Sequence, residues 1–182
     1  MTEIDDVLTF WFQETPEEKW FEAKSADFDN QIRDRFEALY RKAVAGDCDD
    51  WTATPQGCLA LVVLLDQFPR NMFRDRPEAF AADDRALAVA KRAIDAGHDT
   101  ALTQQQRAFL YMPFQHCEDL AEQQRSCDLF QSLDSNPDWY GYADRHREIV
   151  ERFGRFPHRN RILGRETTPE EAAFLKEPNS SF

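Results

Sequence analysis

One segment of the chain, residues 56–67, is apolar on nearly every face when it is drawn as a helix. Its apolar side chains include Leu59, Leu61, Val62, Val63, Leu64 and Leu65. A helix of this kind is stable only where other elements surround it. A buried strand is the competing interpretation, because part of the run is β-branched, but helix-start signals on both sides and the lack of a second strand-like segment favour a helix. The sequence therefore predicts a central, buried helix.

Helix-start and helix-stop signals divide the rest of the chain into amphipathic segments. Thr54-Pro55 and Thr168-Pro169 each combine a capping side chain with a proline. Proline lacks a backbone N–H, but in the first turn of a helix that N–H would have no helical partner in any case. Residues 25–46 carry one apolar face and end at a glycine. Further helices are expected over residues 2–12, 77–96, 103–111, 118–133 and 137–154, with Pro69 stopping or bending the central helix and Pro113 interrupting another.

These signals predict an all-α fold class. With 182 residues and fifteen Phe, the chain can bury one sizeable core, and only six Gly argue against a β-sandwich. We expect one domain, residues 1–182, of eight or more antiparallel helices joined by short loops. Aromatic residues at helical spacing are read mainly as core, namely Trp11, Phe12, Trp20, Phe21, Trp51, Trp139, Tyr140 and Tyr142.

The net charge and the cysteines indicate which binding partners and which cellular compartment to expect. The net charge of -12 disfavours general binding to nucleic acid or anionic membrane, although residues 145–165 hold seven Arg against two Glu. These Arg either pair with the acidic remainder of the chain or form a local basic site. The longest apolar run, residues 58–65, is far shorter than the roughly 20 residues of a membrane span. The acidic N-terminus does not resemble a signal peptide, so we expect a cytoplasmic protein with four reduced cysteines.

A short motif occurs twice after expected helix ends, as Phe-Pro-Arg-Asn at residues 68–71 and Phe-Pro-His-Arg-Asn at residues 156–160. If the two loops face each other, they bring four donor side chains together, namely Arg70, Asn71, Arg159 and Asn160. Asp66 precedes Arg70 by four residues and could orient its guanidinium. Arginine offers forked hydrogen bonds that suit a phosphate or a carboxylate. The alternative is that these Arg side chains bond the free carbonyls of helix ends.

Histidines lie close to the same motifs. His116 follows the Pro113 break, His158 lies in the second loop, and the helix of His146 should pack nearby. A histidine beside an Arg-lined anion pocket could serve as a general acid or base, because it titrates near neutral pH. Neither HExxH nor another helical metal spacing is present, so we predict no metal site and no cofactor.

Three ordered strings resemble the signatures of the bacterial domain-of-unknown-function 924 family. They are LLDQFPRN at residues 64–71, FLYMPFQHCE at residues 109–118 and RFGRFPHRNRILGR at residues 152–165, and the resemblance extends over nearly the whole chain. It implies a helical fold grouped with tetratricopeptide-like proteins and no established activity. The polar signature positions that it marks are Asp66, Gln67, Arg70, Asn71, His116, Glu118, Gln123, Arg155, His158, Arg159, Asn160 and Arg165.

Two functional hypotheses follow. In the first, an Arg- and His-lined pocket binds a small anionic ligand, and a catalytic version would use His116 or His158 as proton donor. Its binding residues would be Asp66, Arg70, Asn71, Glu118, Arg155, Arg159, Asn160 and Arg165. In the second, a tetratricopeptide-like module binds a protein or peptide in an apolar groove and has no catalytic activity. A nucleic-acid module ranks third, since it needs residues 145–165 exposed as one face. Whether the protein is an enzyme stays open.

Overall fold

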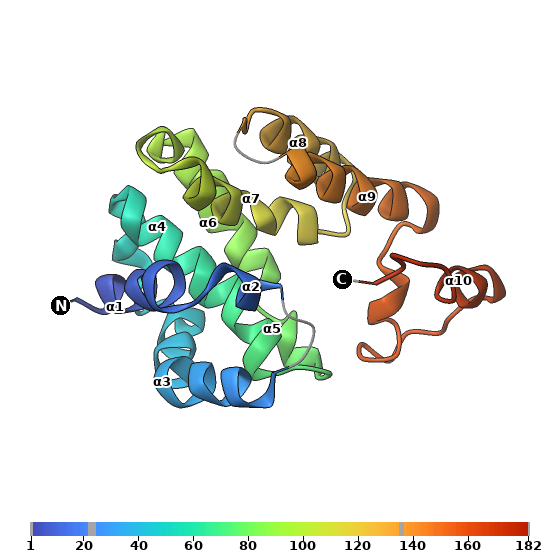
Figure 1. Ribbon diagram of the computed structural model, residues 1–182, viewed down its shortest axis with the longest axis horizontal. Coiled ribbons are helices and arrows are strands. Elements are labelled where there is room, and N and C mark those ends of the chain that lie inside the picture. Colours follow the sequence, from blue (N-terminus) through green and yellow to red (C-terminus); the bar gives the residue numbers. More distant parts are fainter. Residues whose placement is uncertain (1, 22–24, 135–136, 182) are drawn as a thin grey trace.

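The computed structural model describes residues 2–21, 25–134 and 137–181, and within these ranges it contains helices and no strand. The predicted all-α fold class is therefore confirmed. In Figure 1, α8 and α9 lie together at one side of the molecule, and α10 lies at its far edge, beyond the larger N-terminal part. The tetratricopeptide-like, antiparallel arrangement stays a prediction.

Ten α-helices are assigned within the described ranges. They are α1 (Glu3–Thr9), α2 (Glu17–Trp20), α3 (Ala26–Ala45), α4 (Pro55–Val62), α5 (Phe68–Met72), α6 (Asp83–Asp95), α7 (Gln104–His116), α8 (Leu120–Gln131), α9 (Pro137–Phe153) and α10 (Pro169–Phe174). Shorter turns complete them. Two are π turns, at Phe10–Glu14 and Val63–Gln67, and four are 3-10 turns, at Asp49–Ala53, Pro77–Ala79, His98–Ala101 and Pro157–Arg159.

The central helix is buried as predicted. The hydroxyl of Thr54 accepts a hydrogen bond from the Gly57 amide and caps α4, and residues 58–65 are at most 1% exposed. Helix α4 packs against α1, α6 and α7. The helix begins where the Thr-Pro signal places it because that signal supplies both a cap and the fixed backbone angle of a first turn.

Three expected helix boundaries are wrong. Pro69 does not stop the helical run, because the π turn at Val63–Gln67 precedes it and Pro69 occupies the first turn of α5. The alternative, a bend at Pro69, stays a prediction. Pro113 lies inside α7, which continues to His116. The expected helix over residues 77–96 is a 3-10 turn followed by α6, which starts only at Asp83.

The aromatic expectation holds only in part. Trp11 is fully buried, but Phe21, Tyr140 and Tyr142 are exposed. The four cysteines are free thiols, and three of them, Cys48, Cys58 and Cys127, are buried. No helix within the described ranges is both long enough and apolar enough to cross a bilayer.

The chain from the second half of α9 onward, called the C-terminal part below, has a small apolar core of its own. Ile149, Val150, Phe156 and Phe174 form it, with Phe153 packed against them. Helix α9 ends at Gly154, whose φ of 69° is the left-handed conformation that favours glycine. The chain then turns back through the second Phe-Pro motif, which places Arg159 between this C-terminal part and the larger core.

Candidate functional site

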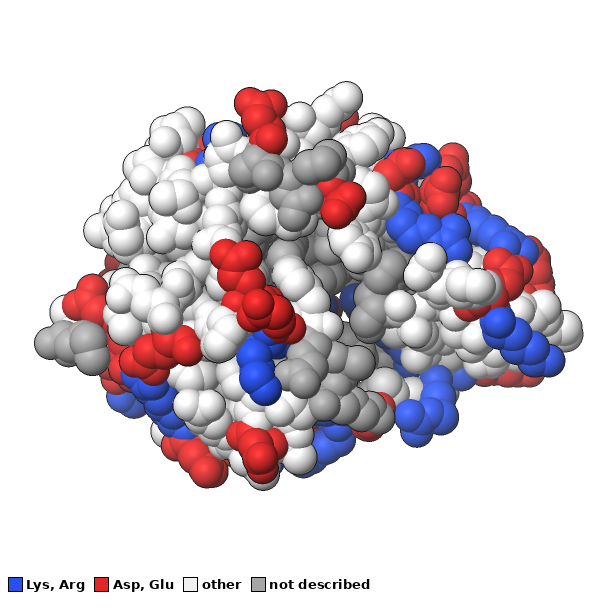
Figure 2. Space-filling view, in the orientation of Figure 1, with Lys and Arg blue, Asp and Glu red and all other residues white. Residues whose placement is uncertain are grey.

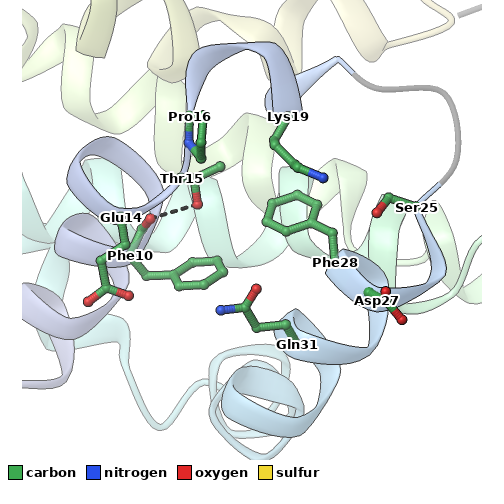
Figure 3. Close-up of a pocket in the computed structure, with 9 residues that line it drawn as sticks. All are labelled: Phe10, Glu14, Thr15, Pro16, Lys19, Ser25, Asp27, Phe28 and Gln31. Carbon is green, nitrogen blue, oxygen red and sulfur yellow. Dashed lines mark hydrogen bonds between the residues drawn. The ribbon is translucent and has the colours of Figure 1, made fainter.

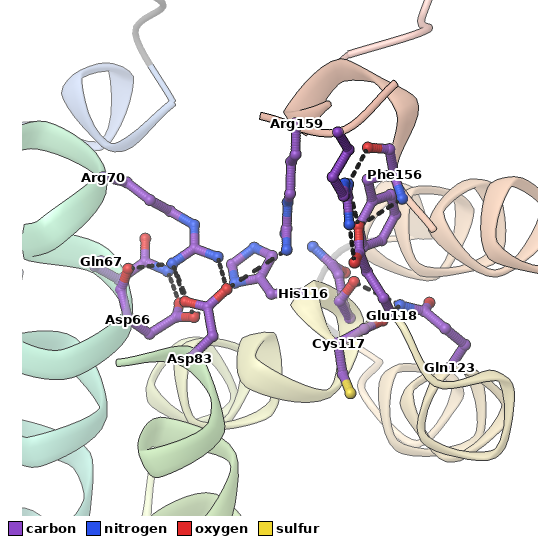
Figure 4. Close-up of polar contacts among 12 residues, drawn as sticks. Asp66, Gln67, Arg70, Asp83, His116, Cys117, Glu118, Gln123, Phe156 and Arg159 are labelled. Atoms are coloured by element: carbon purple, nitrogen blue, oxygen red, sulfur yellow. Dashed lines mark hydrogen bonds and ion pairs between the residues drawn. The ribbon is translucent and has the colours of Figure 1, made fainter. Parts of the chain in front are cut away.

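A fully buried carboxylate, that of Asp66, lies at one end of the polar cluster in Figure 4, beside Gln67 and Arg70. Its Oδ1 is 2.7 Å from Nδ1 of His116 and 3.2 Å from Nη1 of Arg70, and its Oδ2 accepts a hydrogen bond from the Gln67 amide. Burial alone would raise the pKa of Asp66. The charge of Arg70 and the contact with His116 outweigh burial and hold that pKa below its usual range, so Asp66 is ionised.

A second carboxylate, that of Asp83 at the start of α6, links two arginines. It accepts a fork from Arg70, with distances of 2.9 Å to Nη1 and 3.0 Å to Nη2. Nη1 of Arg159 lies 3.6 Å from Asp83 Oδ2. Arg70 also donates to the backbone carbonyl of Asp66, at 2.6 Å. The two Phe-Pro motifs therefore meet at their arginines, through a carboxylate that sequence reasoning did not single out.

Arg159 is a buried cation with few partners. Its side chain is 8% exposed, and its guanidinium carbon lies 4.6 Å from the ring centroids of both Phe80 and Phe156. Its Nε is buried and has no hydrogen-bond partner among the described residues. Burial, together with the like charge of Arg70, lowers the pKa of Arg159 to about 10. Arg159 remains charged at neutral pH, and its buried Nε–H has no acceptor among the described residues.

Three histidines, His116, His146 and His158, lie in the same region. The ring of His116 lies 6.2 Å from that of His146, and the ring of His158 lies 5.8 Å from that of Phe156. Burial lowers the pKa of all three, with nearby positive charge adding to the effect, and the pKa of His158 falls to about 4. The pKa of about 4 places the titration of His158 well below neutral pH, and the lowered pKa of His116 favours its neutral ring at pH 7.

The neutral state assigns the proton on His116. Asp66 is ionised and accepts only, so Nδ1 of His116 carries the proton and donates to Asp66 Oδ1. The lone pair is then on Nε2. The His116 side chain is 13% exposed, so its ring is not sealed inside the core. His116 is arranged as a proton acceptor with an oriented ring.

Glu118 and Arg165 form a tie between distant segments. The carboxylate of Glu118, in the loop after α7, accepts a fork from Arg165 at 2.6 and 2.9 Å and the backbone N–H of Phe156 at 2.7 Å. Burial opposes ionisation of Glu118, but these bonds keep its pKa lowered. Arg165 also donates to Asn160 Oδ1 at 3.0 Å. These side chains hold the second Phe-Pro motif in place.

Three predicted binding residues pair with acidic side chains outside the Asp66 and Asp83 cluster. Arg155 makes a fork to Glu171 at 2.7 and 2.9 Å and lowers the pKa of that carboxyl to about 2. Asn160 donates to the same carboxylate. Asn71 donates to Asp29, at 2.9 Å, on the side of α5 that faces α3. The pairing of Arg155 with Glu171 matches the alternative in which these arginines pair with the acidic remainder of the chain.

One face of the molecule has a narrow opening. Figure 2 shows a narrow opening between the larger part and the C-terminal part, with Lys or Arg atoms at its bottom. Two cavities lie elsewhere. One, of about 230 Å³, is lined by Phe10, Lys19, Phe28 and other residues of mixed polarity (Figure 3). The other, of about 160 Å³, adjoins α7 and is mainly aromatic.

The fold and this cluster define a helical protein with a buried Asp-His-Arg centre, and comparison assigns it to a family. The chain belongs to the bacterial proteins of unknown function called DUF924, whose model matches residues 7–179. The family resemblance of the three sequence strings is thus confirmed. It is similar to a solved structure of a protein of unknown function from Agrobacterium tumefaciens, at 48% identity and a TM-score of 0.90, over 95% of this chain and 96% of that one. No curated protein matches the chain.

Proposed function

We propose that the protein binds a small anion, a phosphate or a carboxylate, at Arg159, with Arg70 beside it. The observation that carries the proposal is the guanidinium of Arg159, which is buried between two Phe rings with its Nε unbonded among the described residues. Burying a cation without full hydrogen bonding costs free energy. An anion that accepts from Nε would remove part of that cost, and a guanidinium edge offers two parallel donors to such a ligand.

The surrounding charges support a specific site more than a general basic surface. Arg70 is fully engaged by Asp66 and Asp83, so it contributes positive potential and a fixed position. Among the described residues, the ion pair of Arg159 is the looser contact with Asp83, at 3.6 Å. A bound anion would therefore compete with Asp83 for Arg159 but not for Arg70. We therefore assign Arg159 as the binding donor and Arg70 as the group that keeps Asp83 and Asp66 in place.

A catalytic version of the site would use His116 as proton acceptor. Asp66 fixes the ring and leaves the lone pair on Nε2, which is the arrangement that general-base catalysis requires. The lowered pKa makes the neutral, accepting form dominant at pH 7 and disfavours the proton-donor role. Asp66 is a positioning residue in this proposal, since it acts through His116.

A thermal-shift titration with inorganic phosphate and with acetate, at constant ionic strength, tests the proposal. A ligand that binds only the folded chain stabilises it by about 2.7 kcal/mol when its concentration is 100 times Kd. We expect a concentration-dependent rise in Tm for the wild type and none for Arg159→Met. Arg152→Met is the matched control, because Arg152 lies in the same segment but pairs with Glu170 at the surface. No rise in the wild type, or an equal rise in Arg159→Met, would contradict the proposal.

The peptide-binding alternative needs an elongated apolar groove. The apolar cavity beside α7 holds about 160 Å³, which is room for a single ring, whereas a bound peptide presents several side chains. The small-ligand proposal fits this volume better.

A further inference from the structure

The cavity beside α7 is lined mostly by aromatic and apolar side chains. Trp20 and Phe21 come from the α2 region, Phe109 and Met112 from α7, and Trp139 from α9. On one side, Gln105 donates to Glu17 at 2.9 Å, so these two polar side chains satisfy each other across the edge of the cavity. An apolar cavity of about 150 Å³ in another protein stays dry and binds benzene. At about 160 Å³, this cavity has room for one aromatic ring.

One face of α7 connects this cavity with the polar cluster. Gln105, Phe109, Met112 and His116 follow one another at spacings of four, three and four residues, which places them along a single stripe of the helix. His116 comes one turn after Met112, about 6 Å farther along the axis. The stripe that lines the cavity therefore ends at the proposed proton acceptor.

A single side chain, that of Gln67, bridges the two regions. Its amide nitrogen lies 3.3 Å from Sδ of Met112, which lines the cavity, and it also donates to Oδ2 of Asp66. The Gln67 amide therefore contacts both a residue that lines the cavity and the Asp66 carboxylate. The apolar cavity and the charged cluster are adjacent parts of one region.

We infer that the ligand of this protein is a hydrophobic anion, whose aromatic or short apolar body fills the cavity of Trp20, Phe109, Met112 and Trp139 while its phosphate or carboxylate lies toward Arg159. This inference rests on the proposed anion site and names its ligand class. The ring gains by leaving water. The anion gains the unbonded N–H of a buried guanidinium. In a molecule that carries both groups, the two favourable free energies add, whereas the cost of lost translational freedom is incurred once.

Calorimetry with three matched probes tests the inference: 4-phenylbutyrate, butyrate, which lacks the ring, and 4-phenylbutanol, which lacks the charge. We expect 4-phenylbutyrate to bind at least tenfold more tightly than either of the others. Trp20 and Trp139 line the cavity, so 4-phenylbutyrate should also change the tryptophan fluorescence, and butyrate should not.

Two variants separate the two halves of the site. Trp139→Ala removes one wall of the cavity at a partly exposed position. In this variant we expect the affinity for 4-phenylbutyrate to fall to that for butyrate, and the affinity for butyrate to stay unchanged. In Arg159→Met, we expect 4-phenylbutyrate to fall to the affinity of 4-phenylbutanol. Circular dichroism verifies that both variants are folded.

The outcomes distinguish the inference from the proposed function. If butyrate binds through Arg159 and the phenyl group adds nothing, or if its gain survives in Trp139→Ala, the inference is overturned and the anion site stands. If 4-phenylbutanol binds as tightly as 4-phenylbutyrate and Arg159→Met changes nothing, the anion site is overturned. If none of the probes binds to the wild type, both are overturned.

Discussion

Nδ1 of His116 lies 2.7 Å from Oδ1 of Asp66, although 50 residues separate them in the chain. Asp66 reaches this position from a π turn, and His116 reaches it from the last residue of α7. π turns inside helices are frequent at functional sites. Because Arg70 already balances the charge of Asp66, the carboxylate can accept from a neutral histidine, and the histidine keeps its second nitrogen for other chemistry.

Asp66→Asn should destabilise the protein strongly. The change leaves Arg70 and His116 beside a neutral group in the core, and loss of one partner from a buried ion pair costs about 3 to 5 kcal/mol. Urea denaturation measures the free energy of unfolding. Glu37→Gln is the control, because it breaks an ion pair with the exposed Arg41, and we expect a cost of about 1 kcal/mol or less. Similar losses in the two variants would show that Asp66 is not the centre of a buried network.

Stability should fall as the pH falls from about 6.5 toward 4, through His158. Its pKa is about 4 in the folded chain and roughly 6.5 in the unfolded chain, so in this window the unfolded state binds the additional proton. The stability that this histidine contributes is complete above the unfolded pKa and is lost on the acid side, at up to roughly 1.4 kcal/mol per pH unit. His116 and His146 act in the same direction.

Urea denaturation of wild type and His158→Gln at pH 7 and pH 5 measures this dependence. The wild type should lose more stability between the two values than His158→Gln does. His98→Gln, which changes a histidine beside Cys58, is the control and should retain the wild-type dependence. Equal losses in all three proteins would exclude His158 as a source of the acid sensitivity. The contribution of Asp66 is separate, because its lowered pKa acts only below about pH 4.

Local signals in the sequence predicted the caps well. Thr54, Thr103 and Thr168 each cap the helix that they were expected to start, since capping depends on residues within one turn. Proline effects were predicted poorly. The context of Pro69 includes a π turn, and the π turn has no sequence signal that periodicity reveals.

The convergence of Arg70 and Arg159 was also expected from the repeated Phe-Pro motif, and the structure brings both guanidiniums to Asp83. Asp83 itself was missed, because nothing in its local sequence distinguishes it among the 34 acidic residues. Asn71 was expected beside the arginines and lies against Asp29 instead. Pairing of side chains across distant segments is decided by the packing of α5 against α3 and of α6 against the π turn at Val63–Gln67, which a repeated motif does not encode.

Glu118→Gln should loosen the C-terminal part. The Glu118 carboxylate holds both Arg165 and the amide of Phe156, so the variant weakens a charged fork that joins the loop after α7 to the second Phe-Pro motif. Charged hydrogen bonds of this kind are worth about 1.5 to 3 kcal/mol each. Limited proteolysis should cut the chain after residue 153 faster than in the wild type. Glu170→Gln, which breaks only a surface pair with Arg152, should leave the cleavage rate unchanged.

Arg159→Met should leave the protein as stable as the wild type or make it more stable. The two Phe rings give up a cation contact worth about 1 to 2 kcal/mol, but a buried, underbonded charge disappears and an apolar side chain of similar length replaces it. Arg70→Met should behave in the opposite way, because it leaves Asp66 and Asp83 without their main cation, at a cost of about 3 to 5 kcal/mol. Urea denaturation of the two variants side by side measures the contrast. If Arg159→Met loses as much stability as Arg70→Met, the charge of Arg159 stabilises the fold. If Arg159→Met is stable but no longer binds phosphate, the charge of Arg159 is used for ligand binding.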